Sequence, residues 1–84
     1  MQYNVIFTKR AAKDVSSLEP EVKDRIAEAL TKYLEDPLSY AKKMVDPSLG
    51  TYRLRIGDYR VIFDIKGEEI VILRVGHRKD IYRK

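Results

Sequence analysis

The segment at residues 52–65, YRLRIGDYRVIFDI, constrains this chain most, because it reads as two strands joined by a two-residue turn. Gly57 and Asp58 supply the turn, and apolar residues alternate with other residues on both sides of it. A two-residue loop sets the register of a hairpin, so Arg55 is expected directly opposite Arg60. The geometry of this hairpin is therefore predicted from local sequence alone.

The predicted register divides the hairpin into two faces, because side chains alternate along a strand. The apolar face is expected in the core and carries Tyr52, Leu54, Ile56, Tyr59, Val61 and Phe63. The other face carries Arg53, Arg55 and Arg60. Like charges that face each other across a ladder cost about 0.2 to 1 kcal/mol, so folding alone does not explain them. Binding of a polyanionic partner explains why the arginines face each other.

The distribution of charge points the same way. The 84 residues carry a net charge of +4. Residues 1–50 hold eight Lys and Arg against eight Asp and Glu, whereas residues 51–84 hold nine against five, so the whole excess lies beside the hairpin. This asymmetry predicts an anionic partner for the C-terminal part of the chain. The alternative is a basic surface that binds nothing.

The remaining pattern predicts a single α+β domain over residues 1–84. Thr8 is a suitable N-cap for a first helix, and Pro20 suits the first position of a second helix that ends at Asp36. Strands are expected at residues 2–7, 51–56, 59–65 and 69–75, and a long loop at 37–50. The order is β-α-α-β-β-β, with a helical hairpin packed on one face of a mostly antiparallel sheet.

The last predicted strand has apolar residues on both faces. Ile70 and Ile72 are expected to join the core, and Val71, Leu73 and Val75 to line the arginine face. The chain then continues into a cationic tail, which we expect near the same face, with His77, Arg78, Lys79, Tyr82 and Arg83.

Several classes of function are excluded by composition. The chain has no cysteine and one histidine, so we expect no disulfide, no metal site and no cofactor. No apolar run is long enough for a signal peptide or a membrane span. We therefore expect a cytoplasmic protein with no membrane partner.

Arginines on a rigid sheet suit a phosphodiester, because the guanidinium binds phosphate through a planar fork of donors. RNA cleavage without a metal also requires groups that move protons, and arginine stays protonated. His77 and Tyr82 are the acid–base candidates of the tail, and Tyr82 can instead stack on a base. Further RNA contacts are expected from Lys42, Lys43, Lys79 and Arg83.

Each of these residues also has a structural interpretation. Arg53 and Asp64 lie diagonally across the hairpin and can form a surface ion pair, which leaves Arg55 opposite Arg60 unexplained. The other residues are then surface or packing groups: His77, Lys42 and Lys43 as solvated side chains, Tyr82 as an anchor of the tail, and Tyr33 and Tyr40 as packing residues.

The layout and the motifs GDYRVIF and GHRKDIY resemble the RelE branch of the RelE/ParE superfamily of toxins, over essentially the whole chain. This resemblance implies a ribosome-dependent endoribonuclease that cuts mRNA in the ribosomal A site without metal, leaving a 2′,3′-cyclic phosphate. It also implies a cognate RelB-like antitoxin as partner, with the ribosome and mRNA as targets.

The resemblance assigns catalytic roles by position to Arg53, Arg55, Arg60, Arg78 and Tyr82, with His77 as a further candidate. The family pattern has lysines at the two strand positions, and here both are arginines, so proton transfer shifts to Tyr82 or His77. Two alternatives stay open. The ParE branch inhibits DNA gyrase without the nuclease residues, although Arg60, Arg78 and Tyr82 favour RelE, and a non-toxic nucleic-acid-binding module shares the charge pattern.

Overall fold

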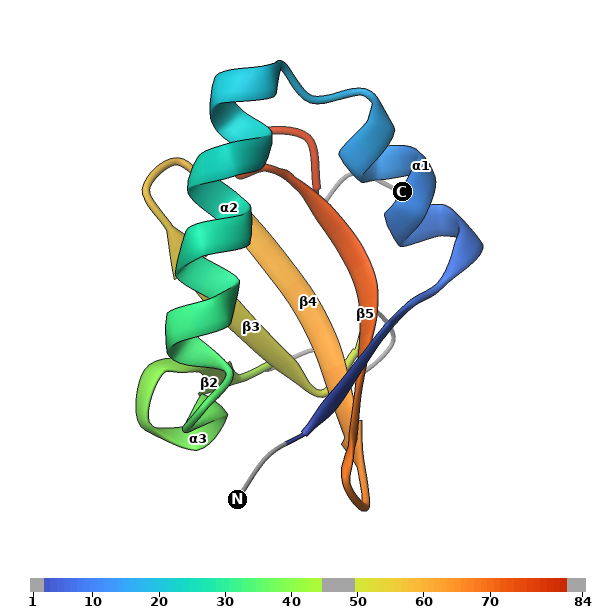
Figure 1. Ribbon diagram of the computed structural model, residues 1–84, viewed down its shortest axis with the longest axis vertical. Coiled ribbons are helices and arrows are strands. Elements are labelled where there is room, and N and C mark those ends of the chain that lie inside the picture. The colour runs from blue at the N-terminus through green and yellow to red at the C-terminus, as the bar shows by residue number, and fades with distance from the viewer. Residues whose placement is uncertain (1–2, 45–49, 82–84) are drawn as a thin grey trace.

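The computed structural model of the protein describes residues 3–44 and 50–81. Two helices, α1 and α2, lie on one face of a curved five-stranded sheet (Figure 1). The elements in chain order are β1 Asn4–Phe7, α1 Lys9–Ser16, α2 Pro20–Tyr33, α3 Pro37–Tyr40, β2 Lys42–Lys43, β3 Tyr52–Ile56, β4 Tyr59–Lys66 and β5 Glu69–His77. The predicted α+β class is confirmed, but the expected loop at 37–50 contains two short elements, α3 and β2.

The sheet has the strand order β1-β5-β4-β3-β2. Strand β1 runs parallel to β5, and the other neighbours are antiparallel, as expected of a mostly antiparallel sheet. The predicted register of the β3–β4 hairpin is confirmed, with Arg55 opposite Arg60 and Arg53 opposite Ile62. Gly57 has φ of 59°, a conformation that suits glycine at a tight hairpin turn.

The helix ends follow from capping chemistry. Thr8 is extended, and its side-chain oxygen accepts a hydrogen bond from the Ala11 N–H at 3.1 Å, which confirms it as the N-cap of α1. Pro20 opens α2 as predicted. Helix α2 ends at Tyr33, earlier than expected, because Pro37 starts a separate turn of helix.

A β-bulge in β5 changes which side chains reach each face. Phe63 pairs with Ile72, but its neighbour Ile62 pairs with Arg74, so Leu73 is the extra residue. The alternation therefore reverses after Leu73. Our expectation that Val75 lines the arginine face is wrong: Val75 is 2% exposed and belongs to the core.

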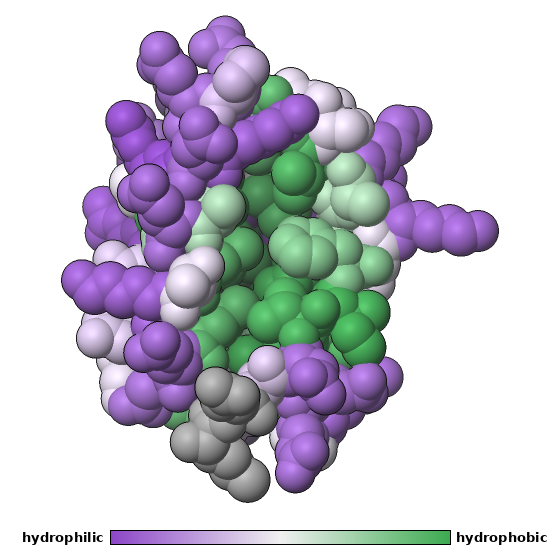
Figure 2. All heavy atoms as spheres, in the orientation of Figure 1, coloured by the Kyte–Doolittle hydropathy of each residue, from purple (hydrophilic) through white to green (hydrophobic). Residues whose placement is uncertain are grey.

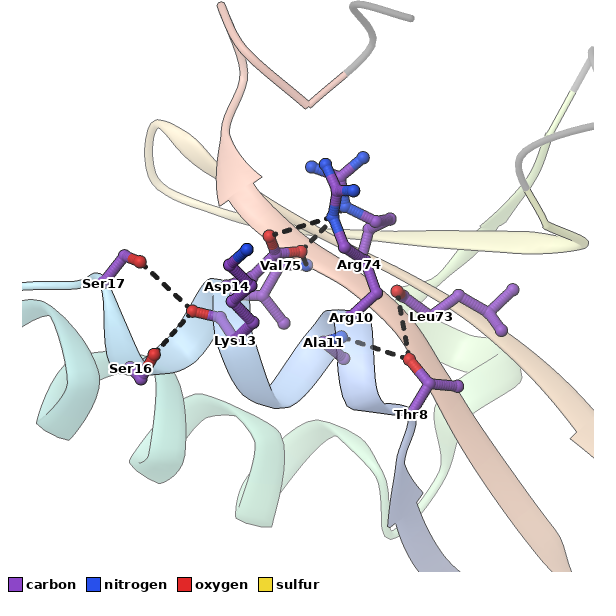
Figure 3. A network of polar contacts seen from close by, with 10 residues as sticks. All are labelled: Thr8, Arg10, Ala11, Lys13, Asp14, Ser16, Ser17, Leu73, Arg74 and Val75. Carbon is purple, nitrogen blue, oxygen red and sulfur yellow. Dashed lines mark hydrogen bonds and ion pairs between the residues drawn. The ribbon is translucent and has the colours of Figure 1, made fainter.

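Helix α1 supports the bulged part of β5. The Asp14 carboxylate accepts hydrogen bonds from the backbone N–H of Val75 at 3.0 Å and from Nε of Arg74 at 2.8 Å (Figure 3). The Asp14 carboxylate therefore does two things at once: it accepts a backbone N–H at the edge of β5, and it pairs with the charge of Arg74.

The core fills the space between the helices and the sheet. Its buried apolar residues come from both helices and three strands: Ala11, Ile26, Leu30, Leu34, Leu54, Ile56, Val61, Phe63, Ile70, Ile72 and Val75. Burial on this face holds the sheet rigid and leaves the opposite face to carry the charged residues.

The opposite face is covered in part by the chain around Gly50. A Cβ atom at Gly50 would lie 2.5 Å from Cγ2 of Ile62, so only glycine fits this crossing. The next residue, Thr51, donates its backbone N–H to Oδ1 of Asp64 at 2.7 Å. These contacts bury Ile62 beneath the chain.

Candidate nucleic-acid interface

The arginine face forms around the β3–β4 hairpin and the short edge strand β2. Lys42 of β2 pairs with Arg53, and Arg55 pairs with Arg60 in the same sheet. Paired residues project from the same side, so four cations share one surface. They line a hollow of about 140 Å³ together with Tyr40. We call this the basic hollow; its lining residues are Tyr40, Lys42, Arg53, Arg55 and Arg60.

The hairpin turn holds Arg60 in place. Its Nη1 donates to the carbonyl oxygens of Gly57 and Tyr59, both at 2.8 Å. Within the described part of the chain, the other donors of the guanidinium, on Nε and Nη2, have no hydrogen-bond partner. The turn therefore holds the Arg60 side chain in a defined position at the basic hollow.

Among the residues that the structure describes, the cations of the basic hollow form no ion pair with a carboxylate. Within residues 3–44 and 50–81, neither Arg53, Arg55 nor Arg60 lies within 4.0 Å of an acidic side chain. Asp64 instead accepts the Thr51 N–H. The structural alternative of an Arg53–Asp64 ion pair is therefore wrong, and the positive charge of the hollow is uncompensated by the part of the chain that the structure describes.

Arg78 and Lys79 lie at the end of the hairpin. The backbone N–H of Arg78 donates to the carbonyl oxygen of Asp58 at 2.8 Å, and its Nε lies 3.9 Å from Oδ1 of the same residue. Its side chain is 55% exposed. Both Arg78 and Lys79 are exposed beside the turn, and neither lines the basic hollow.

His77 lies on the other side of the sheet. It pairs with Tyr59, and the two rings meet edge to face with centroids 5.4 Å apart. Its Nδ1 accepts the backbone N–H of Lys79 at 3.1 Å. The bulge at Leu73 reverses the alternation of β5, so the expectation that His77 joins the arginines is wrong for this fold.

Lys43 is a further expected site residue that lies away from the arginines. Lys43 pairs with Tyr52, whose ring packs against the core, so Lys43 projects from the face opposite Lys42. It is not part of the basic hollow. Tyr82 and Arg83 lie outside the described residues.

Tyr40 is the site residue that sequence reasoning missed. The sequence pattern suggests a packing residue, yet Tyr40 is 49% exposed and lines the basic hollow. No local signal identifies it, because its place depends on β2, a strand too short to show a period.

A second surface is apolar and lies between β1 and α2. Figure 2 shows a green depression there, and it corresponds to a hollow of about 440 Å³. We call it the apolar hollow; it is lined by Tyr3, Val5, Phe7, Ala27, Leu30, Thr31, Leu34 and Glu35. Strand β1 is at the edge of the sheet, so its outer backbone groups are also available. Exposed apolar surface of this kind is typical of protein–protein contacts.

The chemistry available in the basic hollow is anion binding and charge stabilisation. Guanidinium and ammonium groups line it, with one phenol. Across residues 3–44 and 50–81, no cluster of three or more His, Asp and Glu side chains is placed to hold a metal ion. The described helices are also all too short or too polar to cross a membrane.

Comparison with known proteins places the chain among toxins. Residues 5–82 match the family model described as the ParE toxin of type II toxin–antitoxin system, parDE. The Toxin RelG of Mycobacterium tuberculosis is 38% identical over 87 aligned positions, which span 100% of both chains.

Solved structures agree with this placement. A chain of the RelBE2 toxin–antitoxin complex from Mycobacterium tuberculosis superimposes with a TM-score of 0.82 at 33% identity, covering 93% of this chain and 100% of that chain. A chain of the archaeal RelE–RelB complex from Pyrococcus horikoshii has a TM-score of 0.71 at 27% identity, covering 95% and 99%. The structural similarity extends over most of the chain in both comparisons.

Proposed function

The chain belongs to the RelE/ParE superfamily of type II toxin–antitoxin toxins, and we propose that it is a ribosome-dependent endoribonuclease that inhibits translation by cleaving mRNA in the ribosomal A site. The observation that carries this proposal is the basic hollow, which gathers Lys42, Arg53, Arg55 and Arg60 on one rigid surface. Its size and charge suit one phosphodiester group.

The proposed reaction is an internal transfer at phosphorus. The ribose 2′-oxygen loses its proton and attacks the adjacent phosphorus, and the bond from phosphorus to the 5′-oxygen breaks. The 5′-oxygen gains a proton, so the products are a 2′,3′-cyclic phosphate and a 5′-hydroxyl. Arg53, Arg55 and Arg60 neutralise the charge that builds on the phosphorane, which is the role that fixed donors perform best.

Proton transfer needs a group other than these arginines, because guanidinium stays protonated. His77 is on the opposite face, so we assign this role to Tyr82, and we place Arg78 as a contact to RNA beside the hairpin turn. A site with few bases depends on substrate orientation, which a ribosome supplies. We therefore expect little cleavage of naked mRNA.

The test is a translation reaction with purified ribosomes, in which primer extension maps cuts in the mRNA. Arg55→Ala and Arg60→Ala should each reduce the cutting rate by about 100-fold, the effect typical of losing one stabilising donor. Lys42→Ala and its matched control Lys43→Ala form a second comparison, because these neighbours on β2 face opposite sides. Of these two lysine variants, only Lys42→Ala should slow the cutting of mRNA. Wild-type cutting by both arginine variants would refute the proposal.

A second candidate function is inhibition of DNA gyrase, which the match to the ParE family model favours. A supercoiling assay separates the two functions. Blocked supercoiling together with intact mRNA would support this candidate.

We further propose that a RelB-like antitoxin covers the apolar hollow. The similar structures are RelB–RelE complexes, and this hollow offers apolar side chains beside an open strand edge. Val5→Asp should abolish neutralisation by the co-expressed antitoxin while mRNA cutting continues. Ile6→Asp is the matched control, because Ile6 is equally exposed but projects from the other face of β1. Equal neutralisation of both variants would contradict this assignment.

A further inference from the structure

Tyr40 occupies an unusual place for an aromatic side chain. It is the last residue of α3, it is 49% exposed, and its neighbours in the basic hollow are cations. Burying an aromatic ring stabilises a fold, and a half-exposed ring contributes only part of that stabilisation. Core packing therefore does not account for an exposed ring in this position.

The ring is held in a defined orientation. Its centroid lies 4.6 Å from that of Tyr33, at an interplanar angle of 30°. Tyr33 ends α2 and packs against the core. One side of the Tyr40 ring is thus supported by a residue that is itself fixed.

Short-range contacts fix the turn that carries the ring. The hydroxyl of Ser39 lies 2.6 Å from Oδ2 of Asp36, and the N–H of Ala41 donates to the carbonyl oxygen of Pro37 at 2.8 Å. Pro37 itself is buried. A ring on such a support loses little conformational entropy when a ligand stacks on it.

We propose that Tyr40 and the basic hollow together form a nucleotide subsite, in which the cations bind a backbone phosphate and an adjacent base stacks on the Tyr40 ring. This assignment rests on the proposed binding of RNA and adds a base-binding residue to it. Proteins that hold single strands combine the same two parts, a cationic groove and an aromatic platform. Stacking accepts any base, because every base has a π-face.

The test uses ligands that cannot be cleaved. A single-stranded DNA hexamer of adenines lacks the 2′-hydroxyl, and a hexamer of abasic spacers has the same phosphates without bases. The affinity of each for the full chain is measured by fluorescence anisotropy at low salt. We expect wild type to bind the adenine hexamer about 5- to 140-fold more tightly than the abasic hexamer, as one stacked base predicts.

Three variants make the test specific. Tyr40→Ala should remove the preference for the adenine hexamer and leave binding of the abasic hexamer unchanged. Tyr40→Phe should retain the preference, because it retains the ring. Leu38→Ala is the matched control: Leu38 lies on the same turn, is 59% exposed and does not line the hollow.

Several results would overturn the proposal. One is a wild type with no preference for bases, and another is a Tyr40→Ala variant that keeps the preference. If the folded Tyr40→Ala variant loses affinity for both hexamers equally, the ring only positions the cations. The proposed nuclease activity fails separately: a preference that depends on Tyr40 without ribosomal cleavage would refute the nuclease and leave the subsite intact.

Discussion

Asp14 offers the sharpest test of how the fold positions its C-terminal strand. Its Oδ2 accepts from Arg74 and from the Val75 N–H, and its side chain is 14% exposed. A second cation, Arg10, is 3.7 Å from Oδ1 but is mostly exposed and contributes little. A hydrogen bond to a charged group contributes about 1.5 to 3 kcal/mol, and solvent reaches this pair in part. We therefore expect Asp14→Ala to lower the free energy of unfolding by about 2 to 3 kcal/mol.

This loss is large for a domain whose total stability is about 5 to 10 kcal/mol. It corresponds to a fall in Tm of roughly 10 to 20 °C for a chain of this size. Urea unfolding followed by circular dichroism measures the change. Asp14→Asn should lose about half as much, since its amide oxygen still accepts the Val75 N–H. The matched control is Asp24→Ala, an exposed aspartate of α2. An Asp14→Ala variant within 0.5 kcal/mol of that control would refute the reasoning.

Three further predictions test the packing and the charge. Gly50→Ala should destabilise by about 1 to 3 kcal/mol in urea unfolding, because its Cβ would lie 2.5 Å from the Ile62 methyl group; a neutral effect would contradict this crossing. Thr8→Ala should cost about 1 kcal/mol by the same measurement, as the cap of α1 is lost, and an unchanged midpoint would exclude that role. Arg55→Ala should reduce the slope of log affinity against log salt for single-stranded RNA by about 0.7, whereas Lys43→Ala should leave that slope unchanged. Equal slopes for the two variants would show that RNA does not bind at the basic hollow.

The parts of the fold that were predictable depend on local chemistry. A two-residue turn between strands of period two sets a register without help from the rest of the chain, so the pairing of Arg55 with Arg60 was predicted correctly. The same holds for Thr8 and Pro20, whose roles depend on the geometry of one helical turn.

The composition of the basic hollow was predictable only in part. Arg53, Arg55 and Arg60 follow from the hairpin, but Lys42 and Tyr40 reach the hollow because β2 pairs with β3. A strand of two residues has no periodicity, and it exists only where a neighbouring strand offers hydrogen bonds. Lys42 and Lys43 are therefore indistinguishable in sequence and lie on opposite faces in the structure.

The sequence by itself determined the arginine hairpin, because turn chemistry and side-chain alternation are local and leave one register. The tertiary structure decided what joins that hairpin. In β5 both alternating sets contain apolar residues, so the pattern cannot reveal where the register shifts. The bulge at Leu73, beside the contacts of Asp14 with the strand, turns Val75 into the core and carries His77 away from the arginines. A contact between residues 61 positions apart thus accompanies a change of face that no local pattern encodes.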